Sequence, residues 1–398
     1  MNESRLRVVI AAAYPRQPDS PGGGPEAGLA AMLPFLTRYE DLEVHVVTIE
    51  RGLQSVRIDP TDGAWVHRLP QLCDSQLRNA LVSGRRQIGR YVMQLNPDVV
   101  HARDTYGLMV QQLDVPRVLS IHGFIHADTR LQGGASSWLR SKIWRWAELR
   151  GWSKHPHIIS ISPYVRERLT GIARGVIHDI DNPVHPDFFE VKRRDEGNRI
   201  IFVGSISRLK NPLAIIEAVG RMGGRRTGLA IRLAGRQNPG GYYDLCREAA
   251  RKYGLEAQTE FLGPLSRQQV LRELSEASVF VLPSLQENAP ISLAEAMAAG
   301  VPAIASNRCG MPYMIRHGES GFLVDPTDPE DIAGRLAEIL NDKGLGNSMS
   351  VKSRQIAEER FHPLVVAGRT RKVYLQAAGD RTPARSAGCD AVVRLEQR

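Results

Sequence analysis

Two glutamates stand eight residues apart in the segment Glu287-Asn-Ala-Pro-Ile-Ser-Leu-Ala-Glu295. The apolar run Val279–Leu282 before them is typical of a buried strand, and a helical pattern follows. Acids in a loop that leaves such a strand lie where ligands bind in parallel α/β sheets. The same spacing also fits a capping box, in which Ser292 accepts from the backbone N–H of Glu295 and the Glu295 side chain reaches back. That interpretation leaves Glu287 as a solvated loop residue.

A second loop that could do chemistry is Gly204-Ser-Ile-Ser-Arg-Leu-Lys-Asn-Pro212, which follows the apolar run Arg199–Val203. It carries two cations, Arg208 and Lys210, and its proline suits the first position of a helix. The N–H groups at a helix start favour anions, and Arg and Lys add charge-assisted hydrogen bonds. The loop therefore predicts a diphosphate site, and an exposed basic loop is the alternative.

A glycine-rich loop, Pro21-Gly-Gly-Gly-Pro-Glu26, precedes another helical pattern. Gly22, Gly24 and Ala27 fit the G-x-G-x-x-A of a dinucleotide fingerprint. The glycines begin nine positions after Ala13, however, whereas that fingerprint follows its strand closely. The loop therefore favours a dinucleotide only weakly, and a flexible glycine loop is the alternative.

Two histidines end apolar runs, where an active-site residue would sit in a parallel sheet. His122 follows the run that begins at Val118, and His101 ends a neighbouring run. A lone histidine is more often structural, so His122 is the stronger candidate and His101 the weaker one.

No metal site is expected from the spacing of possible ligands. Asp179-Ile-Asp181 resembles the D-x-D of metal-dependent transferases, but it lies in a linker, and His155-Pro-His157 lacks further spaced ligands. The four cysteines lie far apart, which argues against a zinc site and a disulfide scaffold and favours reduced thiols.

Strands alternate with helices along the chain, which indicates parallel sheets wound on both faces. The first series of predicted strands is Arg7–Ala13, Val44–Thr48, Asp98–His101, Val118–His122 and His157–Ser160. The second series is Arg199–Val203, Ala230–Leu233, Thr259–Leu262, Val279–Leu282, Pro302–Ala305 and Phe322–Val324. Predicted helices are Pro25–Tyr39, Ser75–Leu95, Trp138–Trp152, Pro212–Met222, Tyr242–Tyr253, Arg267–Glu276, Leu293–Ala299, Pro329–Leu340 and Val351–Ala378.

The sequence predicts two Rossmann-like domains with a cleft between them. We expect an N-terminal, acceptor-binding domain over 1–185 and a C-terminal, nucleotide-sugar-binding domain over 186–360. A C-terminal helix over 361–379 could cross back to the first domain, and 380–398 reads as a disordered tail.

The segment from Glu287 to Glu295 resembles the E-x7-E motif of the retaining nucleotide-sugar glycosyltransferases of family 4, which have the GT-B fold. Ile304-Ala-Ser-Asn-Arg-Cys-Gly-Met-Pro312 and Gly318-Glu-Ser-Gly-Phe-Leu-Val324 continue the match in order. The resemblance covers 199–340 well and 7–165 loosely. It implies a sugar transferred, with retention, from a nucleotide diphosphate to an acceptor hydroxyl. We expect the acceptor to be a glycan or lipid-linked precursor in bacterial polysaccharide or glycoconjugate biosynthesis.

The resemblance also implies roles for single residues. The first glutamate of the motif, Glu287, would contact the donor sugar, and the second, Glu295, would hold the ribose hydroxyls. The implied catalytic residues are His122, Glu287 and Lys210. The implied donor-binding residues are Gly23, Gly24, Ser205, Arg208, Lys210, Glu287, Asn288, Ala289, Ile291, Ser292 and Glu295. No metal or cofactor is implied, because the nucleotide sugar is a co-substrate.

The chain departs from the family pattern at three places. Ser205 replaces an arginine, and Arg208 could take over its contact with the phosphates. Asn288-Ala289-Pro290 replaces a stretch that usually contains glycine and an aromatic residue. Tyr313 stands where the family commonly has glutamate. These departures put the choice of donor in doubt.

Four of the five tryptophans lie between Trp138 and Trp152, interleaved with Arg and Lys. A basic, tryptophan-rich helix over 138–154 is typical of a helix that lies on a membrane surface. A helix packed on the N-terminal sheet is an equal alternative, and a nucleic-acid stacking face is a weak one. The net charge of +9 fits an anionic surface as partner. We expect no nucleic-acid partner.

Composition and hydropathy bound the remaining possibilities. With 42% hydrophobic and 24% charged residues among 398, the chain has the composition of a folded globular protein. No run approaches the roughly 18 apolar residues of a spanning helix. We expect a cytoplasmic protein, peripheral at most to the inner face of the plasma membrane. Other functions left open are a GT-B nucleotide-sugar epimerase, an NAD-dependent oxidoreductase and a non-catalytic membrane-surface binder.

Overall fold

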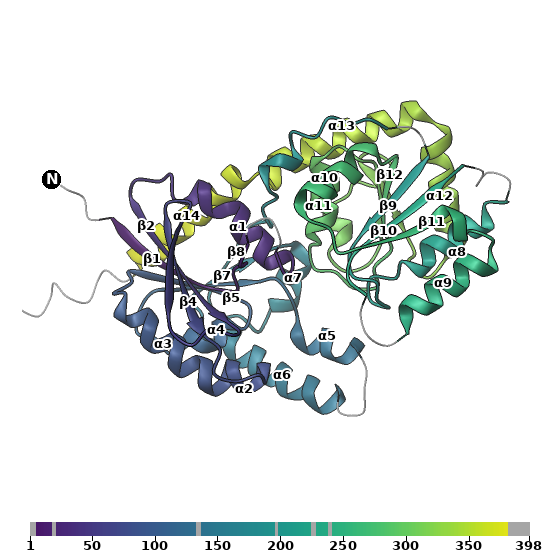
Figure 1. Cartoon of the computed structure of the whole chain (residues 1–398). Coiled ribbons are helices and arrows are strands. Elements are labelled where there is room, and N and C mark those ends of the chain that lie inside the picture. Colours follow the sequence, from purple (N-terminus) through teal and green to yellow (C-terminus); the bar gives the residue numbers. More distant parts are fainter. Residues whose placement is uncertain are drawn as a thin grey trace, which may run out of the picture.

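The computed structural model describes residues 5–17, 21–132, 137–195, 198–223, 228–237 and 241–380. These residues form two α/β lobes that lie side by side (Figure 1). The predicted disordered tail lies outside the described residues except for Asp380, whose carboxylate lies 3.0 Å from the His157 ring.

The N-terminal lobe is built on an eight-stranded sheet of order β3-β4-β2-β1-β5-β6-β7-β8, parallel except where β3 pairs with β4. Its strands are β1 Leu6–Ala11, β2 Leu42–Glu50, β3 Arg57–Thr61, β4 Ala64–Pro70, β5 Val99–Arg103, β6 Arg117–Ile121, β7 His157–Ser160 and β8 Val176–Asp179. Its helices are α1 Gly24–Leu36, α2 Gln76–Arg78, the π-turn η1 Asn79–Ser83, α3 Gly84–Gln94, α4 Tyr106–Val110, α5 Ile125–Gln132, α6 Ser137–Trp152 and α7 Pro163–Leu169.

The C-terminal lobe has a six-stranded parallel sheet of order β11-β10-β9-β12-β13-β14. Its strands are β9 Arg199–Val203, β10 Ala230–Ala234, β11 Thr259–Gly263, β12 Val279–Leu282, β13 Ala303–Ser306 and β14 Gly321–Val324. Its helices are α8 Leu213–Arg221, α9 Tyr242–Lys252, α10 Arg267–Glu276, α11 Ile291–Ala298, α12 Pro329–Asn341 and α13 Lys343–Arg360, and α14 Pro363–Gly379 follows them in the chain. Short 3-10 turns are η2 Pro186–Phe188, η4 Glu256–Gln258 and η5 Met311–Tyr313.

Both sheets reverse their strand order at one point, between β1 and β5 in the first sheet and between β9 and β12 in the second. Crevices for ligands open at such points, beyond the carboxyl ends of the strands. The glycine-rich loop follows β1, the loop with Lys210 follows β9, and the loop with Glu287 follows β12. The topology therefore gathers the three predicted loops at one cleft.

The predicted helix Val351–Ala378 is wrong as a single element. It is two helices, α13 and α14, which break at Phe361 and His362, and the ring of Pro363 starts the second helix. Helix α14 lies against the N-terminal lobe, where the buried Tyr374 hydroxyl lies 2.7 Å from the His101 ring (Figure 1). The chain thus returns to its first lobe after completing the second.

Most other departures from the predicted elements concern irregular or exposed segments, whereas the unpredicted strand β4 is largely buried. The strands β3, β4 and β8 were not predicted; β3 is largely exposed and β8 half-exposed, so neither has the apolar run of a central strand. The predicted helix Ser75–Leu95 is three segments, because the π-turn η1 separates α2 from α3. The core strands match the prediction because they are buried on both faces.

Candidate active site

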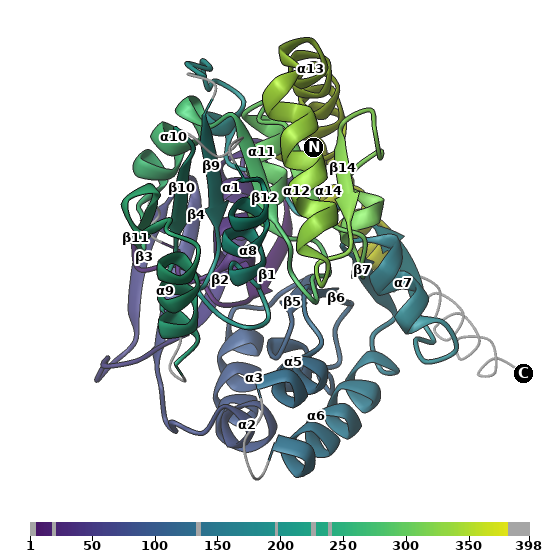
Figure 2. The same cartoon turned by 90° about the vertical axis from the view of Figure 1, so that its right-hand side faces the viewer.

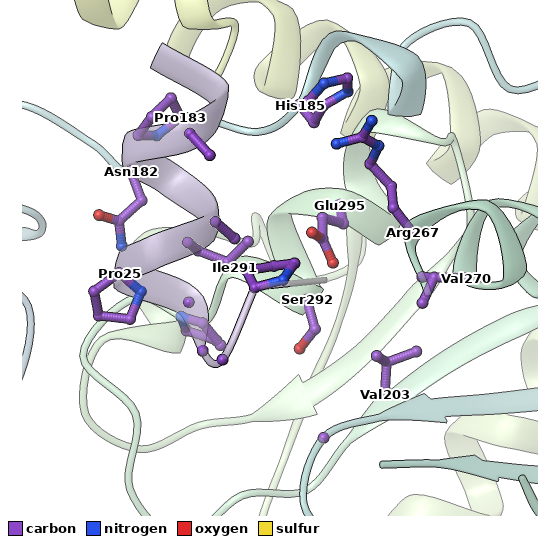
Figure 3. A pocket seen from close by; sticks show the side chains of 18 of the residues that line it. Pro25, Asn182, Pro183, His185, Val203, Arg267, Val270, Ile291, Ser292 and Glu295 are labelled. Carbon is purple, nitrogen blue, oxygen red and sulfur yellow. The ribbon is translucent and has the colours of Figure 1, made fainter. Parts of the chain in front are cut away.

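A cavity of about 930 Å³ lies between the two lobes. Its wall includes every predicted site residue except Arg208. Those residues are Gly23, Gly24, His122, Ser205, Lys210, Glu287, Asn288, Ala289, Ile291, Ser292 and Glu295. Figure 3 shows part of this wall, with α1 on one side and Glu295, Arg267 and Ser292 on the other.

Lys210 and Glu287 form an ion pair at the carboxyl ends of β9 and β12. Their side chains are about one quarter and one eighth exposed. The hydroxyl of Ser207 lies 3.4 Å from the backbone N of Lys210 and helps to fix this loop. The ion pair presents one cation and one carboxylate to the same cavity, a set that fits a phosphate and a sugar hydroxyl.

Glu295 is not part of a capping box, so that interpretation is wrong. Helix α11 begins after Pro290, its N-cap, and no side chain caps it. Burial raises the pKa of Glu295 to about 8, although the positive charge of Arg267 lowers it. Among the described residues no hydrogen bond to its carboxylate is found, so Glu295 is a half-buried acceptor that faces the cavity (Figure 3).

His122 belongs to a buried charged cluster at the ends of β5 and β6. Its Nε2 lies 2.6 Å from the Arg103 guanidinium and its Nδ1 lies 3.2 Å from the Asp104 carboxylate. Burial, together with the charge of Arg103, lowers the pKa of His122, and Asp104 opposes the shift. The His122 ring is therefore neutral near pH 7, and it forms part of the cavity wall.

The glycine-rich loop leads directly into helix α1, with Gly23 as the N-cap. A Cβ on Gly24 would lie 3.4 Å from the Ile291 side chain, so the starts of α1 and α11 lie close together across the cleft. Arg236, which follows β10, donates to the Gly22 carbonyl at 2.8 Å. Two helix N-termini and a cation therefore meet at one end of the cavity, as an anion site requires.

The segment Asn288-Ala289, where the chain departs from the family pattern, forms hydrogen bonds with the N-terminal lobe. The Asn288 amide donates to the His122 carbonyl at 2.9 Å, and the Ser162 hydroxyl donates to the Asn288 carbonyl at 2.8 Å. The Asn182 amide donates to the Ala289 carbonyl at 3.2 Å.

A Cβ on Gly310 would lie 1.7 Å from the Asn288 carbonyl oxygen, so only glycine fits at that close approach.

The other two departures lie differently. The Ser205 hydroxyl is 3.1 Å from that of Ser207, on the cavity wall. Arg208 is exposed near Tyr242 of α9 and does not line the cavity. The Tyr313 hydroxyl donates to the Glu167 carboxylate of the N-terminal lobe at 2.7 Å. Tyr313 therefore adds a further contact between the lobes, where the family commonly has a carboxylate.

The residues set aside as metal ligands have other partners. Asp179 pairs with Arg166, and Asp181 pairs with Arg360. His155 lies 3.1 Å from the Gly107 carbonyl, and His157 lies 3.2 Å from the His178 ring. His101, the weaker active-site candidate, is buried between Tyr374 and Ser120, with both ring nitrogens at 2.7 Å from a hydroxyl, and does not line the cavity. Within the described part of the chain, no cluster of three or more His, Cys, Asp or Glu could hold a metal ion.

The tryptophans of α6 divide into two pairs. Trp144 and Trp152 belong to the core of the N-terminal lobe, whereas Trp138 and Trp146 are about 60% exposed. Leu139 and Ile143 are exposed beside them. We call the exposed residues Trp138, Leu139, Ile143 and Trp146 the α6 apolar stripe. One face of α6 packs on the lobe, as the interpretation of a packed helix predicts, and the α6 apolar stripe on the other face is exposed.

Five residues near the cavity escaped the sequence analysis: Arg103, Asp104, Asp128, Arg236 and Arg267. Arg103 ends β5 and Asp104 follows it, and this place at the end of an apolar run could have singled the pair out. Arg236 likewise follows β10. Asp128 and Arg267 lie inside helices, and no local pattern marks them.

Two family models match consecutive parts of the chain. "Glycosyltransferase Family 4" matches residues 22–188, and "Glycosyl transferases group 1" matches residues 185–356. Two α/β lobes with a cleft between them form the GT-B fold, and the two matches specify the family. The chain belongs to the group 1, family 4 glycosyltransferases, which confirms the predicted family and fold class.

Curated relatives and solved structures agree with this assignment. The chain is 28% identical over 304 residues to a glycogen synthase of Mycobacterium tuberculosis, covering 72% of this chain and 71% of the relative. It is 26% identical to an MMP alpha-(1->4)-mannosyltransferase of Mycolicibacterium hassiacum, covering 81% and 79%. A sucrose-phosphate synthase of Thermosynechococcus elongatus has a similar structure, with a TM-score of 0.80 at 18% identity over 94% and 100% of the chains. Anabaena Alr3699/HepE, solved with UDP and glucose, superposes with a TM-score of 0.70 at 15% identity over 94% and 100%.

Proposed function

We propose that this glycosyltransferase moves a sugar, with retention, from a nucleotide diphosphate to an acceptor hydroxyl. The observation that carries the proposal is the cavity wall formed by the Lys210–Glu287 ion pair and by Glu295. The wall offers a cation for phosphate, a carboxylate beside it, and a second carboxylate without a hydrogen bond from any described residue. These three groups match the three parts of a nucleotide sugar: diphosphate, sugar and ribose.

The donor would lie along the C-terminal side of the cleft. Glu295 accepts hydrogen bonds from ribose hydroxyls, and Lys210 with the starts of α1 and α11 holds the diphosphate. Negative charge grows on the diphosphate as the bond to the sugar breaks, so these fixed positive groups stabilise the transition state. Glu287 and the neutral ring of His122 bind the sugar on opposite sides of the cleft.

The acceptor would enter from the N-terminal lobe. We favour a lipid-linked or other glycan precursor, because the α6 apolar stripe is flanked by the exposed cations Arg140, Lys142 and Arg145. Apolar and cationic groups on one helix face fit the headgroup region of an anionic membrane. In the described part of the chain, no helix is both long and apolar enough to cross a bilayer. We propose that the contact is peripheral, on the cytoplasmic side.

A donor screen tests the proposal. Purified protein is incubated with UDP-, GDP- and ADP-sugars, with and without EDTA, and release of nucleoside diphosphate is followed. We expect slow hydrolysis of one donor class, with water as acceptor and no loss on chelation. Release abolished by EDTA and restored by Mn²⁺ would contradict the metal-independent clamp at Lys210. Conversion of the sugar to an epimer without nucleotide release would favour the epimerase, and binding without reaction the non-catalytic binder.

A further inference from the structure

Asp128 is a carboxylate of the N-terminal lobe that contacts the C-terminal lobe next to Glu287 of the cavity wall. It lies in α5, and its Oδ1 is 3.5 Å from the Gln286 amide of the opposite lobe. Its Oδ2 lies 3.9 Å from the position that a Cβ on Gly123 would occupy, next to His122. Asp128 therefore lies beside Gln286, the residue that precedes Glu287, and on the lobe where an acceptor would bind.

The helix that carries Asp128 is anchored at its first turn. The buried Glu148 of α6 accepts from the backbone N–H of Ile125 at 2.9 Å and of His126 at 3.1 Å. The His126 ring lies 2.6 Å from the same carboxylate, and Ser141 donates to the His126 carbonyl at 2.7 Å. These contacts hold α5 in place, so the position of Asp128 is set by the fold.

The Asp128 carboxylate is surrounded mainly by groups that disfavour its charge, and it has few hydrogen-bond donors. Burial, together with the negative charges of Glu287 and Glu148, raises its pKa to about 6, while Lys210 and His126 lower it. Lys210 pairs with Glu287. Among the described residues the long contact to Gln286 is the hydrogen bond found for the Asp128 carboxylate. A half-buried carboxylate with one long hydrogen bond has acceptor capacity left for a ligand.

We propose that Asp128 accepts a hydrogen bond from the reacting hydroxyl of the acceptor and orients its oxygen toward the donor sugar. Two carboxylates, Asp128 and Glu287, would then face the reacting end of the acceptor. That end must be neutral and rich in hydroxyl groups, since a phosphate there would meet two negative charges. The inference deepens the proposed function and rests on it.

The test compares wild type with Asp128→Asn, using the donor identified by the screen and water as the acceptor. The amide keeps the shape of the side chain and its contact to Gln286 but loses the charge. We expect turnover at pH 7.5 to fall about tenfold to hundredfold, as for the loss of a hydrogen bond to a charged group. Affinity for the free nucleoside diphosphate should change less than about twofold, because Asp128 does not touch the donor in this account.

The pH profile separates a ligand-binding role from a structural one. Wild-type turnover should decline below about pH 6, as Asp128 gains a proton and stops accepting, and Asp128→Asn should lack this decline. Asp244→Asn, an exposed carboxylate of α9, serves as the control and should behave as wild type. Unchanged turnover and pH profile in Asp128→Asn would overturn the inference, as would an equal loss of nucleotide affinity. Failure of wild type to bind or hydrolyse any donor would instead contradict the proposed function.

Discussion

Glu295 combines a raised pKa with a place on the cavity wall, and both bear on nucleotide binding. A ribose hydroxyl donates to the ionised carboxylate, so binding pulls the proton off an acid whose pKa is about 8. We predict that Glu295→Gln weakens nucleoside diphosphate binding by about 1.5–3 kcal/mol. Calorimetry at pH 7 in two buffers of different ionisation enthalpy should find roughly one proton released by wild type and none by the variant.

The same group makes a stability prediction with a definite sign. The pKa of Glu295 is raised in the folded chain, so its contribution to stability is full below the unfolded pKa and is lost as pH rises to about 8. Glutamine cannot ionise. The melting temperature of Glu295→Gln should therefore rise relative to that of wild type as the pH increases from 5 to 8. A constant difference over this range, with unchanged nucleotide affinity, would argue that Glu295 is an ordinary helix residue.

The sequence predicted which loops carry site residues, but it did not predict which residues contact each other in the folded chain. Lys210 and Glu287 are 77 positions apart in the chain, and the resemblance alone suggested that they act together. The parallel sheet brings them into contact because β9 and β12 are neighbours. Asp128 and Arg267 could not be predicted, because their relation to the cleft depends on how α5 and α10 pack. Arg208 was predicted from its charge, but its side chain lies outside the cavity wall.

Helix α6 lies at the lower edge of the molecule in Figure 2. Its buried tryptophans anchor the helix in the N-terminal lobe, whereas the residues of the α6 apolar stripe are exposed. The periodicity of apolar residues could not separate the two faces of α6, because tryptophan and arginine occur on both of them. The break between α13 and α14 escaped prediction for a related reason, since helical patterns on both sides of Pro363 run together.

The α6 apolar stripe makes a prediction for vesicle binding. Trp138→Ser/Trp146→Ser and Arg140→Glu/Arg145→Glu should each lower co-sedimentation with vesicles of phosphatidylglycerol and phosphatidylcholine. Each cation near an anionic surface contributes about 1 kcal/mol, and added salt should screen it. Trp65→Ser, an exposed tryptophan of β4, is the control. Equal sedimentation of all four proteins, each folded by circular dichroism, would leave an acceptor in solution as the better account.

At the scale of the whole molecule, two departures from the family pattern join the lobes. Asn288 bonds to the His122 carbonyl, and Tyr313 bonds to Glu167. Each hydrogen bond contributes about 1 kcal/mol net, so together they favour the closed cleft by roughly tenfold or more. We predict that Asn288→Ala/Tyr313→Phe increases the radius of gyration measured by small-angle X-ray scattering without nucleotide.

Tyr243→Phe, on α9 of the C-terminal lobe, is the control for that experiment. Added nucleoside diphosphate should restore the wild-type radius, because it would contact both lobes. Scattering curves that match wild type without nucleotide would mean that the other contacts between the lobes, including the packing of α14, keep the cleft closed without these two hydrogen bonds.

The account as a whole depends on Lys210 as the cation that faces the donor diphosphate, and its removal is the most direct test. The measurement is kcat/KM for donor consumption by wild type and Lys210→Ala, with Lys252→Ala, an exposed lysine of α9, as the control. Removing one fixed group that stabilises developing charge costs roughly 10²–10³ in rate. We predict a loss of that size for Lys210→Ala and none for Lys252→Ala. Equal kcat/KM in wild type and Lys210→Ala, both folded, would contradict the proposed site.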